Sequence, residues 1–111
     1  MGLDICFIER KNIVCPHCGE LVKHEAVNSE CCGGRAWYPI LENLGYYVPY
    51  EQRTDENDWY GKDMVLTAEQ VKETYRQIKT NIFELYRAES IMRLIERANM
   101  NENDIVINAD W

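Results

Sequence analysis

The segment from Cys15 to Gly34, CPHCGELVKHEAVNSECCGG, constrains the fold of this chain more than any other part. It holds four of the five cysteines and both histidines. Cys-Pro-x-Cys-Gly is typical of a turn that directs two thiolates at one zinc ion, and a structural zinc site needs four ligands in a tetrahedron. The segment therefore predicts a hairpin with a structural zinc. Its predicted ligands are Cys15, Cys18, Cys31 and Cys32, with His24 as a substitute for one of the last two.

The second half of this predicted site departs from a standard zinc ribbon. A second knuckle would read Cys-x-x-Cys, whereas Cys31 and Cys32 are adjacent, and neighbouring residues rarely turn both side chains to one metal without strain. Cys32 is followed by Gly33 and resembles the end of a second knuckle, so we rank it above Cys31. The remaining cysteine, Cys6, is expected to be a small buried hydrophobic residue of the first strand.

A thiol–disulfide redox protein using Cys15 and Cys18 is the alternative, because Cys-Pro-His-Cys is also the active-site pattern of one class of thiol oxidant. A reactive thiolate usually needs a helix N-terminus after a core strand. Gly19 follows Cys18 at once, and residues 21–27 alternate like a strand rather than a helix. The sequence therefore favours zinc, with free thiols as a third interpretation.

The charge balance indicates the kind of partner. The chain has 19 acidic against 12 Lys and Arg residues, a net charge of −7. Phosphate contacts are made by clustered Lys and Arg, so nucleic acid is disfavoured and a protein partner with a basic surface is favoured. A nucleic-acid-binding zinc ribbon would need a basic stripe near the hairpin. The residues available for such a stripe are Arg10, Lys11, Lys23 and Arg35.

The N-terminal sequence predicts no targeting segment. Residues 1–8 have no basic region of the kind that begins a secretory leader, and no apolar run approaches the about 20 residues of a membrane helix. We therefore expect a cytoplasmic protein, without membrane contact. In that compartment cysteines more often bind metal or act in catalysis than form disulfides.

Hydrophobic patterning predicts one α+β domain over residues 1–111, with a small antiparallel sheet and a zinc-knuckle hairpin packed against two or three helices. Residues 1–35 form the first strand and the hairpin, with a turn at residues 10–12. Residues 36–66 form a short helix, from Ala36 to Leu44, and an acidic, aromatic loop. Residues 67–111 form the helical part and a terminal strand around Ile105–Ile107, which we expect to pair with Leu3–Glu9.

The helical part begins with a capping box at Thr67 and Gln70, and its apolar residues recur at helical spacing from Val71 to Ala98. One helix over residues 68–99 would extend about 48 Å, so it would protrude and need a partner, for example a second copy. Two antiparallel helices would stay within the domain. We favour the two helices, with a break at Thr80–Asn81 or near Ser90, and keep a homodimer through residues 68–99 as the alternative.

Aromatic residues give the candidate partner-binding surface, since Tyr and Trp are frequent interface anchors. The likeliest anchors by position flank the acidic loop: Tyr47, Tyr50, Trp59 and Tyr60. The sequence contains no Gly-x-Ser-x-Gly, Walker, dinucleotide-binding or His-Glu-x-x-His motif. We therefore predict a non-enzymatic, zinc-stapled protein-interaction domain.

A few residues resemble a loose group of small phage and prophage proteins. They are the opening Met1-Gly2-Leu3-Asp4-Ile5, the Cys-Pro-x-Cys-Gly of Cys15–Gly19, Gly61-Lys62, and the short acidic terminal strand. The resemblance implies a phage-encoded accessory protein, for example an inhibitor of a host system. It implies no catalytic residue and no substrate.

Overall fold

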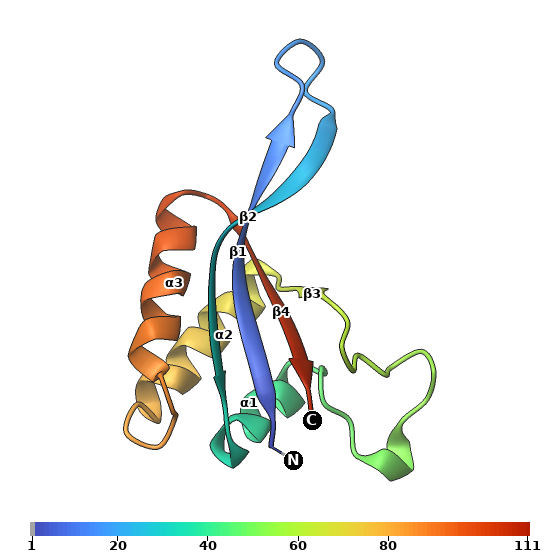
Figure 1. Cartoon of the computed structure of the whole chain (residues 1–111), viewed down its shortest axis with the longest axis vertical. Helices are drawn as coiled ribbons and strands as arrows, with labels where there is room; N and C mark the ends of the chain where they lie inside the picture. Colours follow the sequence, from blue (N-terminus) through green and yellow to red (C-terminus); the bar gives the residue numbers. More distant parts are fainter. Residues whose placement is uncertain (1) are drawn as a thin grey trace.

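A computed structural model describes residues 2–111 as a four-stranded antiparallel sheet with helices packed against it, an α+β fold as predicted (Figure 1). The strand order is β2-β1-β4-β3. The strands are β1 (Asp4–Val14), β2 (Leu21–Gly33), β3 (Met64–Val65) and β4 (Asp104–Asp110). The α-helices are α1 (Tyr38–Asn43), α2 (Ala68–Thr80) and α3 (Ala88–Met100), and single 3-10 turns occupy Arg35–Trp37 and Tyr50–Gln52.

The core lies between the helices and one face of the sheet. Alternate residues of β1, namely Ile5, Phe7 and Glu9, are completely buried on this face. Phe7 packs against Trp37 with ring centroids 5.8 Å apart. Burying a side chain of this size is worth about 1.5–3 kcal/mol, so the alternation of β1 anchors the whole sheet.

The terminal strand pairs with the first strand, as the sequence predicts. β4 runs antiparallel to β1, with Ile5 opposite Ala109 and Phe7 opposite Ile107. β4 therefore occupies the centre of the sheet beside β1, and the start of β1 lies beside the end of β4 (Figure 1).

The helical part consists of two helices, as predicted. The capping box forms: the Gln70 amide donates to Thr67 Oγ1 at 3.2 Å, and the Thr67 amide donates to Gln70 Oε1 at 2.9 Å. α2 ends at Thr80 and α3 starts at Ala88, after Arg87 in a left-handed conformation. The protruding rod that motivated a dimer through residues 68–99 is therefore absent. Within residues 2–111, no helix has the length and apolar character needed to cross a membrane.

The first two strands are longer than the sequence predicts. The predicted turn at residues 10–12 is wrong, because β1 continues to Val14 and pairs with β2 throughout. A β-bulge replaces the turn: Glu9 lies opposite Asn28 but Arg10 lies opposite Ala26, so Val27 is an extra residue in β2. Bulges of this kind bend a strand without ending it.

The distal part of the β1–β2 hairpin projects beyond the sheet and the helices (Figure 1). The pairing of β1 with β4 ends at Arg10 and Asp104, after which β1 and β2 pair only with each other. We call residues 11–25 the arm. Almost all of its side chains are exposed or half-buried, including the apolar Val14, Leu21 and Val22.

Candidate metal-binding knuckle and aromatic cluster

A tight turn at the end of the arm holds the Cys-Pro-His-Cys-Gly sequence. The Cys15 amide donates to the Glu20 carbonyl, and the Gly19 amide donates to the Cys15 carbonyl, each at 2.8 Å. Gly19 has a φ of +74°, a conformation that glycine adopts at little cost. The turn thus reverses the chain within five residues and keeps Cys15 and Cys18 on the same loop.

The polar groups of the turn lower the pKa of the Cys15 thiol. The backbone of Cys18 contributes most, followed by the backbone of His17 and the side chain of Cys18. Donors aimed at a sulfur stabilise its thiolate. Since the thiolate is the form that binds metal or attacks a disulfide, this turn prepares Cys15 for either chemistry.

The structure does not bring the four predicted zinc ligands together. Cys31 lies opposite Cys6 at the base of the hairpin, and Cys15 follows Cys6 by nine positions, about 30 Å of extended chain. The predicted second knuckle does not form, because β2 continues straight through Cys31 and Cys32 to Gly33.

Each of the other predicted ligands has a different environment. Cys31 is disulfide-bonded to Cys6, with their Cα atoms 4.1 Å apart. Cys32 points into the core, and burial raises the pKa of its thiol to about 12. His24 lies on the arm, with Nδ1 2.7 Å from Asn12 Oδ1. Among residues 2–111, no cluster of three or more His, Cys, Asp or Glu side chains is placed to hold a metal ion.

Cys6 is thus not the isolated buried residue that the sequence predicts. It is half-buried on the sheet face opposite the core and crosslinks β1 to β2. The spacing alone would not have shown this, because the two register shifts in the hairpin move the partner of Cys6 to Cys31. The distance to the tip also separates this disulfide from Cys15 and Cys18, so the two cysteine pairs do not exchange within one molecule.

The predicted partner-binding aromatic residues are largely occupied within the molecule. The Trp111 ring, which the sequence analysis did not select, makes edge contacts with Tyr46, Tyr47 and Tyr60 at centroid distances of 6.1, 5.0 and 5.0 Å. The Arg53 guanidinium lies 5.3 Å from the Trp111 ring centroid. We call these five residues the aromatic cluster. It fastens the acidic loop to the end of β4.

Two of the four predicted aromatic anchors remain accessible. Tyr50 is 82% exposed and Tyr60 is 47% exposed, whereas Tyr47 and Trp59 are half-buried. The most exposed aromatic side chain is one that the sequence analysis passed over: Phe83, at 97%, in the turn between α2 and α3. The sequence analysis placed residue 83 within the helical part, whereas α2 ends before it, at Thr80.

A buried carboxylate at the base of the hairpin also escaped prediction. Glu9 is fully buried and accepts hydrogen bonds from Asn28 at 2.9 Å, Asn103 at 2.7 Å and Asn101 at 3.2 Å. Burial by itself would raise the pKa of Glu9, but these three bonds and the positive charge of Arg97 lower it below its ordinary value. Glu9 therefore ties β1, β2 and the end of α3 together as a charged group.

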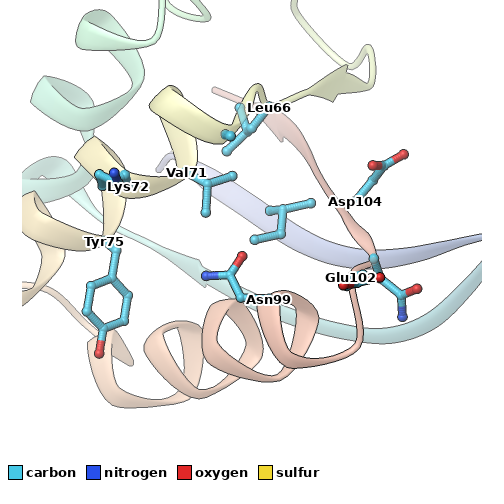
Figure 2. A pocket seen from close by; sticks show the side chains of 10 residues that line it. Leu66, Val71, Lys72, Tyr75, Asn99, Glu102 and Asp104 are labelled. Carbon is cyan, nitrogen blue, oxygen red and sulfur yellow. The ribbon is translucent and has the colours of Figure 1, made fainter.

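A cavity of about 520 Å³ lies between the start of α2 and the end of α3 (Figure 2). Lys72 and Tyr75 line one side, and Glu102 and Asp104 lie across from them. Asp104 already accepts hydrogen bonds from Arg10 and Asn12, each at 3.0 Å. The Asp104 carboxylate is therefore engaged in contacts with β1. The side chains that line the cavity do not form a pre-organised set of acid, base and nucleophile.

Comparisons with protein-family models, curated proteins and solved structures found no significant match to this chain.

Proposed function

We propose that this protein is a non-enzymatic interaction domain whose arm presents Cys15 and Cys18 to a partner as a two-thiolate zinc knuckle. The observation that carries the proposal is the turn itself, which holds Cys15 and Cys18 on one five-residue loop at the end of a projecting hairpin. Such a domain fits the accessory role that the resemblance to phage proteins implies.

The arm favours a protein partner over nucleic acid. Its two lysines, Lys11 and Lys23, are balanced by Glu20 and Glu25, and Arg10 is paired with Asp104 at 3.0 Å. The basic stripe that a nucleic-acid-binding ribbon would need is therefore not supported by these positions.

A thiol–disulfide redox protein is the second candidate, because the lowered pKa of Cys15 supports this chemistry as well as metal binding. In a redox Cys-x-x-Cys, the first cysteine is the nucleophile and its thiolate carries the reactivity. The same two residues would then cycle between dithiol and disulfide in place of holding zinc.

Metal analysis of protein purified under reducing conditions separates the two candidates. We expect zinc in the wild type, its loss in Cys15→Ser and in Cys18→Ser, and its retention in a matched control with Cys6→Ser and Cys31→Ser. Metal-free protein in which Cys15 is alkylated much faster than Cys18 would favour the redox protein. Zinc that survives both tip substitutions would refute the proposed knuckle.

A further inference from the structure

The knuckle at the end of the arm provides only half of a structural zinc site. Tetrahedral zinc takes four protein ligands in such sites, and this turn supplies the two sulfurs of Cys15 and Cys18. The other cysteines are about 30 Å away at the base of the hairpin, given the rise of a strand, where Cys31 is bonded to Cys6 and Cys32 is buried. The missing ligands must come from outside the chain.

The position of the knuckle allows a second molecule to approach it without obstruction. The arm extends along the longest dimension of the molecule, 47 Å, and no helix flanks its tip (Figure 1). Two such tips can meet end to end while the bodies stay apart. A two-fold axis through the metal would then supply an identical Cys-x-x-Cys pair from each side, which is how a closed dimer interface is built.

The charge distribution favours a second copy as the occupant. The whole chain has a net charge of −7, so two copies repel each other overall. The arm is neutral, because its two lysines and two glutamates cancel. Contact between two arms therefore brings no net like charge together.

Apolar side chains beside the knuckle provide the surface for this contact. Val14 and Leu21 face each other across the strands directly below the turn, and Val22 is adjacent. All three are exposed, although β-branched and aliphatic residues at strand positions usually pack against a neighbour. In a two-fold arrangement, these three side chains of one copy would be covered by the same three side chains of the other copy.

From these observations we infer that one zinc ion joins two copies of this protein, bound by Cys15 and Cys18 of each chain. The inference rests on the proposed function and names the partner that completes its site. Each thiol would release its proton when its sulfur binds the metal. Zinc would act as the switch between monomer and dimer.

Sedimentation equilibrium of the reduced full-length protein, titrated with Zn²⁺ alone, tests this inference. We expect a monomer without metal, and a dimer once half an equivalent of zinc has been added, returning to monomer with excess EDTA. Small-angle scattering should show the maximum dimension rising to nearly twice that of the monomer, because the tips meet. A Co²⁺ titration should reach its full thiolate-to-metal absorption at the same half equivalent.

Cys15→Ser and Cys18→Ser should each abolish the dimer, and they lie at an exposed turn where the fold does not depend on them. The matched control, Cys6→Ser with Cys31→Ser, should dimerise as the wild type does. Binding of one zinc per chain to a monomer, dependent on Cys15 and Cys18, would overturn the shared site but preserve the proposed knuckle. Absence of zinc binding would overturn both. A zinc dimer unaffected by the tip substitutions, or one whose maximum dimension barely increases, would also overturn the shared site.

Discussion

The two ends of the β1–β2 hairpin have the same secondary structure but opposite environments. At the base, alternate side chains are buried under the helices, a disulfide crosslinks the strands, and β4 pairs alongside. In the arm, both faces are exposed and the two strands pair only with each other. A two-stranded hairpin alone is at best marginally stable in water. The base therefore supports the arm, and the arm is free to carry chemistry because the fold does not depend on its side chains.

The largest difference in stability is expected between two substitutions that each shorten one side chain, one in the core and one in the arm. Phe7→Ala should lower the free energy of unfolding by about 3–5 kcal/mol, because it leaves a cavity against Trp37. Val22→Ala should change it by less than about 0.5 kcal/mol, because the side chain is exposed. Urea denaturation of both variants measures the difference, and similar losses would show that the arm is part of the core.

The disulfide at the base gives the next largest effect. Reducing the Cys6–Cys31 bond should cost about 3 kcal/mol, because it frees a loop of 25 residues in the unfolded chain. Denaturation with and without reductant measures this loss, and the variant with both cysteines changed to serine should not respond to reductant. Non-reducing mass spectrometry provides the control, since three free thiols are expected in the oxidised wild type.

The buried carboxylate of Glu9 predicts a pH dependence that the arm should lack. Because the pKa of Glu9 is lowered in the folded protein, its ionised form contributes stability above the unfolded-state pKa, and this contribution disappears as the pH falls through the folded-state pKa. Glu9→Gln should cost about 1–3 kcal/mol at neutral pH and flatten the acid limb of the stability curve. The exposed control Glu25→Gln should leave that limb unchanged.

The smallest effect on stability is expected at the tip, where function should nevertheless be affected. Gly19→Ala introduces a side chain at a φ of +74°, where an L residue costs about 1 kcal/mol. We expect a slightly lower urea midpoint and weaker zinc binding. Gly2→Ala is the matched control, since its added Cβ also meets no atom within 4 Å. An equal zinc affinity in both variants would contradict a role for the turn geometry.

Local sequence signals predicted much of the fold. The capping box, the break after Thr80 and the pairing of the terminal strand each follow from patterns within one element or from strand propensity. The strand character of residues 21–27 was predicted from their alternation. The continuity of β1 was missed at residues 10–12, because three polar residues in a row lack the alternation that identifies a strand and were predicted to be a turn.

Of the candidate site, only the turn at the end of the arm was predictable from the sequence. The turn from Cys15 to Gly19 is encoded by five consecutive residues, whereas the position of Cys31 depends on the register of a long hairpin. The aromatic cluster and the three asparagines around Glu9 join residues that are distant in the chain. Trp111 in particular has no local pattern that would mark it, because its partners lie more than fifty residues away.

The two irregularities in the hairpin affect β2 alone. β2 has 13 residues and β1 has 11, since Val27 and Val22 are each left without a partner in the ladder. An extra residue in one strand bends that strand and increases its twist. β1, which leads directly into Cys15, has no extra residue and keeps its alternation. The two valines therefore act on the direction of the arm through the curvature of one strand, several residues away from the cysteines.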